Sequence, residues 1–143
     1  MNTITEVFLT GKQFQKLYDK SISSAAKKFR MTRMEMEVIL FLLNNPEMNT
    51  AREIAECRMY TKSSVSKAVE LLIGKGYLRG EEDTRDRRII RLCLEEKAQP
   101  VCEAALREQE DYIETLYHGV TKDERETMIR VIEKMAANVR PKL

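Results

Sequence analysis

The chain has 143 residues, of which 43% are hydrophobic and 34% charged, and it holds only 5 glycines and 3 prolines. This length fits a single domain that can bury a core without disulfide bonds, and the composition favours a mostly helical protein over a disordered or loop-rich one. The net charge of +2 argues against indiscriminate binding of polyanions, so contact with nucleic acid would require local clusters of lysine and arginine.

Several other classes of protein are disfavoured. The longest apolar run, residues 38–43, is too short to span a bilayer, and the amino terminus lacks the pattern of an export signal, so we expect a cytoplasmic protein without membrane contact. Cys57, Cys93 and Cys102 form no Cys-x-x-Cys pair and His118 is the one histidine, so neither a disulfide framework nor a metal or other cofactor is expected. No catalytic triad can be assembled around His118, which disfavours an enzyme.

Four Thr-x-x-Glu sequences predict helix starts. In this capping box the threonine hydroxyl and the glutamate carboxylate satisfy backbone N–H groups that have no partner in the first helical turn. The four sequences are Thr3/Glu6, Thr32/Glu35, Thr50/Glu53 and Thr121/Glu124.

The first predicted helix covers residues 3–29 and carries a long apolar stripe. Three- and four-residue steps join Ile4, Val7, Phe8, Phe14, Leu17, Tyr18, Ile22, Ala25, Ala26 and Phe29. A lone domain of this size would leave much of the stripe in water, which indicates a partner from another chain. The alternative is that the stripe packs wholly within its own monomer.

Residues 33–61 have the pattern of a helix-turn-helix. The helix predicted at 33–44 is apolar on most faces, which indicates burial, and it ends before Pro46. Thr50 opens a short helix with Ile54, Ala55 and Cys57 turned inward, and residues 58–60 form the turn into Thr61.

The helix that starts at Thr61 has two different sides. Its apolar positions are Val65, Ala68, Val69, Leu72 and Ile73, and the opposite side carries Lys62, Ser63, Ser66 and Lys67. Gly74 and Gly76 end the helix. An extended segment from Tyr77, a charged tip at residues 81–88 and alternation at residues 89–94 predict a β-hairpin, so that helix, strand, tip and strand form a winged helix.

Two further helices are predicted after the hairpin. The first covers residues 98–119, where Gly119 stops it, and the second runs from Thr121 towards Pro141. The predicted fold is therefore mostly α with a small β-hairpin wing, in one domain over residues 1–143.

Three motifs resemble those of the MarR family of bacterial transcriptional regulators. They are Asp83-x-Arg85-Asp86-x-Arg88 at the tip, Lys62-Ser63-Ser64-Val65-Ser66-Lys67 at the helix start, and Leu94-Glu95-Glu96-Lys97-Ala98, which has Glu and Ala where the family has Thr and Gly. The resemblance implies a winged helix-turn-helix lobe at residues 31–97. It also implies that residues 1–30 and 98–143 form dimerisation helices that intertwine across a two-fold axis.

The resemblance and the residue types together identify candidate DNA contacts. Short serine side chains at Ser63, Ser64 and Ser66 let a helix lie deep in the major groove, Lys67 can reach a guanine or a phosphate, and Lys62 can reach the backbone. On the wing, either Arg85 or Arg87 enters the minor groove, and Arg88 either contacts DNA or pairs with an acid. We assign Asp83 and Asp86 to the structure of the wing, since carboxylates facing phosphate would weaken binding.

The predicted function is a sequence-specific regulator, and several points stay open. The resemblance implies a homodimeric repressor that binds an inverted-repeat operator and responds to a small aromatic effector. Its pocket could include Phe14, Tyr18, Phe29 and Tyr60, although core packing explains these residues equally well. The alternatives are a regulator switched by oxidation of a cysteine and a winged-helix module that binds protein without specific DNA binding.

Overall fold

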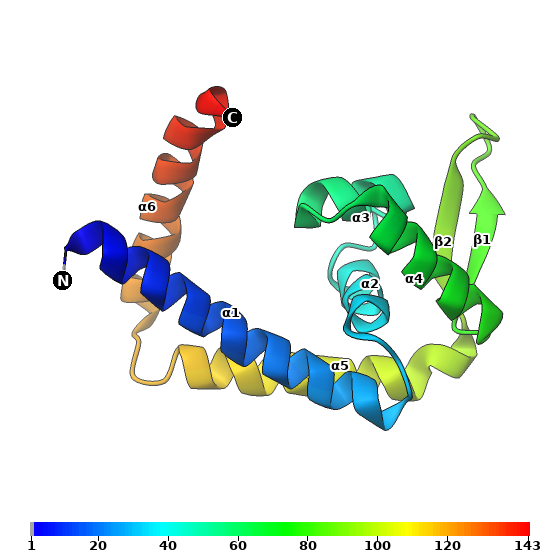
Figure 1. Cartoon of the computed structure of the whole chain (residues 1–143), viewed down its shortest axis with the longest axis horizontal. Coiled ribbons are helices and arrows are strands. Elements are labelled where there is room, and N and C mark those ends of the chain that lie inside the picture. The colour runs from blue at the N-terminus through cyan, green and yellow to red at the C-terminus, as the bar shows by residue number, and fades with distance from the viewer. Residues whose placement is uncertain (1) are drawn as a thin grey trace.

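A computed structural model describes residues 2–143 of the protein. As predicted, it is mostly helical with one antiparallel hairpin (Figure 1). The elements are α1 (Thr3–Lys28), α2 (Arg33–Asn44), α3 (Ala51–Arg58), α4 (Lys62–Gly74), β1 (Leu78–Glu82), β2 (Ile90–Leu94), α5 (Gln99–Leu116) and α6 (Lys122–Val139), with 3-10 turns at Glu96–Ala98 and Arg140–Lys142. Within residues 2–143, none of the helices combines the length and the apolarity that crossing a membrane requires.

The elements form a lobe and an arm. Figure 1 shows α2, α3, α4 and the hairpin gathered in the lobe, while α1 and α5 run side by side beneath it and continue away from it. At the far end of α5 the chain turns into α6, so both termini lie on the arm side. The lobe is therefore held on a pair of long helices whose outer ends project beyond it.

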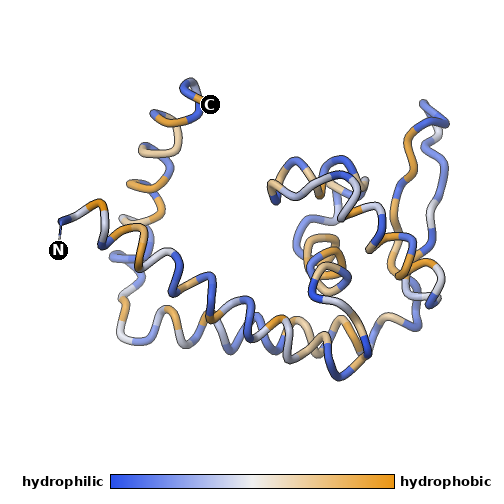
Figure 2. Tube along the Cα trace, viewed as in Figure 1, coloured by the Kyte–Doolittle hydropathy of each residue, from blue (hydrophilic) through white to orange (hydrophobic). Residues whose placement is uncertain are grey.

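The core lies where α2 meets the inner sides of its neighbours. Most of α2 is buried, because its side chains are apolar on nearly every face, as the orange coil at the centre of the lobe in Figure 2 shows. Ile22 of α1, Leu72 of α4 and Val101 of α5 pack around it, each less than 2% exposed. The position of α4 is thus fixed by its apolar side.

The predicted capping boxes are confirmed at three of the four positions. The hydroxyls of Thr32, Thr50 and Thr121 each accept a hydrogen bond from the backbone N–H of the glutamate three residues on, and the carboxylate of that glutamate accepts one from the backbone N–H of the threonine. The prediction for Thr3 is wrong. Asn2 caps α1 instead, and its side chain accepts from the N–H of Thr5 at 2.9 Å.

Two inward positions predicted in the helix-turn-helix are wrong. Cys57 on α3 is exposed, and Ile73 near the end of α4 is 42% exposed. The predicted helix over residues 98–119 also ends early, at Leu116, and Gly119 follows in the left-handed region at φ 76°. These differences lie at helix ends, where burial falls off and a periodic pattern has the fewest residues to define it.

The hairpin pairs Leu78 with Leu94 and Glu82 with Ile90. Leu78 and Leu92 point into the lobe and are buried, which anchors the base of the hairpin. Gly80 leaves room for the side chain of Ile90, since a Cβ there would lie 2.7 Å from Ile90 Cγ2. The hairpin is thus fixed at its base, and its far end extends past the lobe as a wing.

A large apolar surface of the arm faces solvent. Ile4 and Phe8 of α1 are 66% and 67% exposed, Ile132 of α6 is 54% exposed, and α6 has no buried residue. Figure 2 shows apolar residues recurring along both segments. The alternative that the α1 stripe packs wholly within its own monomer is therefore wrong.

Candidate nucleic-acid interface

The outer side of α4 is polar, cationic and exposed. Lys62, Ser63, Ser66 and Lys67 all lie in solvent, whereas Val65, Ala68, Val69 and Leu72 are buried. This separation follows from the helical repeat, which brings residues three and four apart to the same side. The first turn of α4 contains no acid, so its positive dipole end is left open to an anion.

Thr61 fixes the start of this helix. Its hydroxyl accepts from the backbone N–H of Ser64 at 3.2 Å and donates to the Ser64 hydroxyl at 2.7 Å. The Ser64 side chain is therefore engaged by the cap, and the Ser63 hydroxyl lies 3.4 Å from that of Thr61, while Ser63 and Ser66 are both exposed.

The two aspartates of the wing organise its tip. Asp83 Oδ2 accepts from the backbone N–H groups of Arg85 at 3.1 Å and Asp86 at 3.0 Å, which closes an Asx turn. These bonds, the one from Asp86 first, together with the Arg91 guanidinium lower the pKa of Asp83. Asp86 in turn accepts from the backbone N–H of Arg88 at 3.0 Å. The acids thus face the chain of the tip itself.

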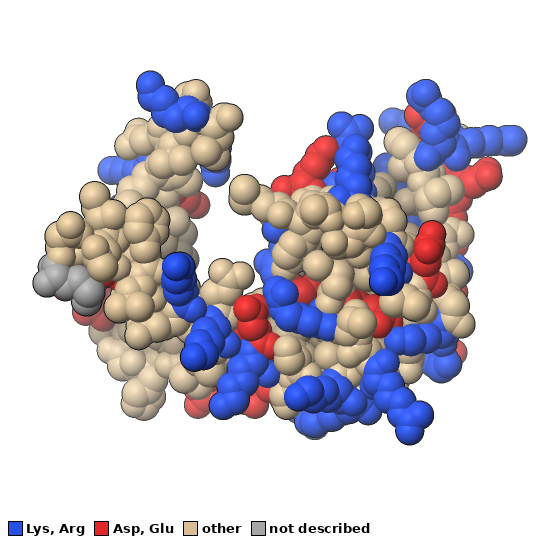
Figure 3. Space-filling model, in the orientation of Figure 1, with Lys and Arg blue, Asp and Glu red and all other residues tan. Residues whose placement is uncertain are grey.

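The arginines of the wing differ in how they are held. Arg88 donates to both carboxylate oxygens of Asp86, at 3.1 and 3.0 Å, and Arg79 pairs with Glu81 at 2.9 Å. Arg87 is 90% exposed and lies 4.0 Å from Glu82. Arg85 is exposed, and within residues 2–143 its guanidinium has no ion-pair partner. Figure 3 shows cationic side chains gathered at the wing tip, from which they extend into solvent.

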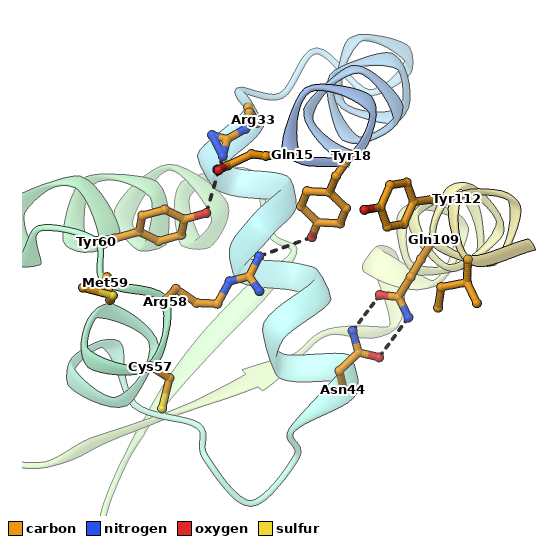
Figure 4. Close-up of a pocket in the computed structure, with 11 residues that line it drawn as sticks. Gln15, Tyr18, Arg33, Asn44, Cys57, Arg58, Met59, Tyr60, Gln109 and Tyr112 are labelled. Atoms are coloured by element: carbon orange, nitrogen blue, oxygen red, sulfur yellow. Dashed lines mark hydrogen bonds between the residues drawn. The ribbon is translucent and has the colours of Figure 1, made fainter. Parts of the chain in front are cut away.

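A cavity of about 550 Å³ lies between the lobe and the arm. Figure 4 shows side chains from α1, α2, α5 and the turn between α3 and α4 converging on it. The rings of Tyr18 and Tyr112 meet edge to face with centroids 5.4 Å apart, and the amides of Asn44 and Gln109 pair at 2.7 Å. Of the four aromatic residues for which a pocket and core packing were equally good explanations, Tyr18 and Tyr60 line this cavity, and Phe14 and Phe29 do not.

A buried carboxylate stands behind this cavity. Glu37 is 2% exposed, and its Oε2 accepts from Arg58 at 2.7 Å and from the Tyr18 hydroxyl at 3.3 Å. Arg33 lies 3.6 Å from the other oxygen of Glu37 and 3.2 Å from Asp19, distances that suit ion pairs although neither contact is aligned as a hydrogen bond. These contacts tie α1 and α2 to the last residue of α3, two positions before the turn residue Tyr60.

The charges of this cluster alter the ionisation of its members. Burial and the Glu37 carboxylate raise the pKa of Tyr18 to about 12, so that its hydroxyl stays protonated. Burial alone would lower the pKa of Arg58, but the Glu37 carboxylate together with Tyr18 and Tyr60 outweighs burial, so that the pKa is raised. This cluster was not predicted from the sequence. A charged pair four residues apart, Arg33 and Glu37, at the start of a helix that is apolar from Val38 to Leu43 was the available signal.

The three cysteines are free thiols. Cys57 lines the mouth of the cavity, while Cys102 is partly buried on α5, where burial raises the pKa of its thiol and so disfavours the reactive thiolate.

Comparisons with known proteins agree with this geometry. Residues 31–89 match a model described as the MarR family, and a comparison with curated proteins found no match. The chain is similar in structure to a MarR-family transcriptional regulator from Silicibacter pomeroyi, with 17% identity, 91% of this chain and 87% of that chain covered, and a TM-score of 0.77.

Two other solved structures carry information about ligands. One is S. aureus MepR in complex with DNA, with 18% identity, coverage of 97% of this chain and 96% of that chain, and a TM-score of 0.72. The other is Bordetella bronchiseptica BpsR, whose DNA binding is regulated by 6-hydroxynicotinic acid, with 15% identity, coverage of 95% and 96%, and a TM-score of 0.69. At these identities the similarity establishes a shared fold.

Proposed function

We propose that this chain, whose residues 31–89 match the MarR family of transcriptional regulators, is a repressor that binds an inverted-repeat operator as a homodimer. The observation that carries the proposal is the exposed serine and lysine side of α4, beside an arginine-bearing wing. A helix that docks on protein would present an apolar or acidic side instead, which disfavours the protein-binding alternative. Regulators of this family are not enzymes, and we propose no catalytic role.

Each lobe supplies one helix for the major groove and one wing for the minor groove. Ser63, Ser66 and Lys67 face the bases, while Lys62 meets phosphate. At the wing, Arg85 and Arg87 extend farthest from acids and are our candidates for the minor groove. Arg88, held by Asp86, contacts DNA only if it exchanges that partner for a phosphate.

The arm forms the interface through which a second chain brings a second copy of the lobe. We assign the exposed apolar faces of residues 1–30 and 98–143 to a two-fold interface and residues 31–97 to DNA binding. A two-fold dimer presents two α4 helices to one side of the duplex, so the operator should contain inverted half-sites one helical turn apart, about 34–36 Å. Selection of bound sites from a random oligonucleotide pool should return such a repeat.

Truncating the contact residues should weaken operator binding without unfolding the protein. Lys67→Ala and Arg87→Ala should each cost about 1–3 kcal/mol of binding if the side chain reaches a base. If it reaches a phosphate, the slope of log affinity against log salt should instead fall by about one. Fluorescence anisotropy across a salt series measures both quantities.

A matched control for these variants is Lys122→Ala. Lys122 is about as exposed as Arg87, but it begins α6 at the far end of the arm (Figure 1). Unchanged affinity for both Lys67→Ala and Arg87→Ala at moderate salt would remove the assigned surface.

We further propose that the cavity between the lobe and the arm binds a small aromatic acid. Tyr18 and Tyr112 offer ring faces and edges, and Arg33 and Arg58 offer guanidinium groups to a carboxylate. Such a ligand competes with Glu37 for Arg58 and thereby acts on the end of α3, next to the turn into α4. It changes operator affinity to the extent that it prefers one arrangement of the lobes over the other.

Removing one ring from the cavity should separate ligand response from DNA binding. Tyr112→Leu should lower affinity for the best member of a panel of benzoate and nicotinate derivatives at least about tenfold, since an aromatic pair and ring burial together contribute more than 1.4 kcal/mol. Its operator affinity without ligand should remain that of the wild type. Calorimetry checks the first result and anisotropy the second.

The control is Tyr117→Leu, at the end of the same helix, where the ring stacks against Arg125 instead of lining the cavity. Equal loss of ligand affinity in both variants would show that the cavity is not the site.

A further inference from the structure

The wing and the start of α3 are separated by a cleft of about 780 Å³. One wall is formed by Thr50 to Glu53 with Glu56, and the other by Asp86 and residues 88–91. Because the cleft is open, apolar packing secures only the base of the hairpin, at Leu78 and Leu92. The outer half of the wing needs another connection to the lobe if it is to keep a fixed direction.

Arg91 crosses this cleft. Its Nε donates to Asp83 Oδ1 at 3.1 Å, and its Nη1 donates to Asn49 Oδ1 at 3.2 Å and lies 3.9 Å from Glu53 Oε2. The side chain is 34% exposed, which is far less than the 90% of Arg87 and Arg88. Its guanidinium is therefore turned towards three side chains of the protein.

Each partner of Arg91 is itself fixed. The second oxygen of Asp83 closes the turn at the wing tip, and Glu53 Oε2 accepts from the backbone N–H of Thr50 at 3.0 Å, in the capping box of α3. The carbonyl of Asn49 also accepts from the backbone N–H of Leu92 at 2.7 Å. One guanidinium thus links the turn at the wing tip to the first turn of α3.

We propose that Arg91 is a positioning residue that holds the wing at a fixed angle to α4 without itself contacting DNA. This inference rests on the proposed DNA-binding function. A wing and a helix that enter neighbouring grooves must have the right separation at the same time. If the wing swings, the fraction of molecules with that separation falls and apparent affinity falls by the same factor.

The first test uses the protein without DNA. In Arg91→Ala, amide hydrogen exchange should accelerate over residues 83–89 and stay at the wild-type rate in α2. Asn49→Ala removes the side chain on the lobe side that hydrogen-bonds Arg91 and should give the same pattern. This variant provides the test if Arg91→Ala does not fold. In Arg91→Lys, which retains one donor, the exchange rate of the wing should fall between those of the wild type and Arg91→Ala. Unchanged exchange in the wing of both alanine variants would overturn the proposal.

The second test is a double-mutant cycle on operator binding. Arg91→Ala should weaken binding about tenfold, as when one molecule in ten holds the competent wing. In a protein whose wing tip already carries Arg85→Ala and Arg87→Ala, adding Arg91→Ala should lower operator affinity hardly any further, because Arg91 acts through that tip. In the Lys67→Ala background, adding Arg91→Ala should still lower operator affinity the full tenfold.

The outcomes distinguish this inference from the proposed function. A tenfold loss that persists in the background with Arg85→Ala and Arg87→Ala would mean that Arg91 contacts DNA itself, which overturns the positioning role. If Lys67→Ala weakens binding and Arg91→Ala does not, the positioning role fails and the proposed function stands. If the wild type binds no duplex, the proposed function fails, and the exchange experiment still decides whether Arg91 holds the wing.

Discussion

Replacing Phe8 and Ile132 with glutamate is expected to leave the protein monomeric and to abolish operator binding at concentrations that saturate the wild type. Both side chains are more than half exposed in the single chain, on the apolar faces that we assign to the dimer interface. Burying each such side chain contributes about 1.5–3 kcal/mol, and a two-fold interface contains two copies of both. A glutamate in their place would have to be buried without a partner.

The loss of operator binding follows from the loss of the second lobe. A dimer binds its second half-site at high effective concentration, which increases avidity by about 10²–10⁴-fold over one lobe. Analytical ultracentrifugation should give the monomer mass, and anisotropy should show residual, salt-sensitive binding. Gln13→Glu with Asn138→Glu places the same charges on exposed polar positions of α1 and α6 and serves as the control. A doubly substituted protein that remains dimeric would contradict the assignment of these faces.

Glu37→Ala is expected to be the most destabilising single substitution among the charged residues that surround the cavity and those of the wing. It leaves the guanidinium of Arg58 without the carboxylate 2.7 Å away and removes the acceptor of the Tyr18 hydroxyl. Losing one partner of a buried pair costs about 3–5 kcal/mol of unfolding free energy, and because Arg58 is itself 38% exposed we expect the lower end, about 3 kcal/mol. Urea denaturation measures this loss.

Two comparisons separate the buried charge from general damage. Glu37→Leu combined with Arg58→Met should recover most of the stability, because no charge is then left unpaired in the interior. Glu56→Ala removes the same kind of carboxylate from the exposed pair with Arg52, and its unfolding midpoint should stay within experimental scatter. A loss for Glu37→Ala as small as that for Glu56→Ala would contradict the importance of the buried pair.

Helix starts and helix sides were predictable because the chemistry that sets them is local. Thr32 and Thr50 begin helices through bonds to residues three positions away, which a sequence displays directly. The same logic misplaced the first cap, since Asn2 is as good a capping residue as Thr3 and stands one position earlier. The exposed side of α4 was likewise predictable, because it is the complement of an apolar repeat.

The polar clusters were not predictable from the sequence, because their members meet only in the folded chain. Arg58 and Glu37 are 21 positions apart, and Arg91 and Asn49 are 42 apart. The spacing of these four residues along the chain does not distinguish them from ordinary polar and charged residues of a protein surface. Cys57 was wrongly predicted to be buried, because its place in the apolar repeat of α3 did not reflect its burial. A helix of eight residues has little more than two turns, so that its last turn can leave the core although the repeat continues.

The carboxylates that hold Arg79 and Arg88 in the unbound wing also bear on how quickly a regulator finds its operator. Under the proposed function, each of these arginines has to release an acid before it can contact a phosphate, so we expect the wing to bind unrelated sequence weakly. A genome contains about 10⁶–10⁹ non-specific sites that compete with the operator for the protein. We therefore expect short residence times at non-specific sites, which leaves more free protein to bind the operator.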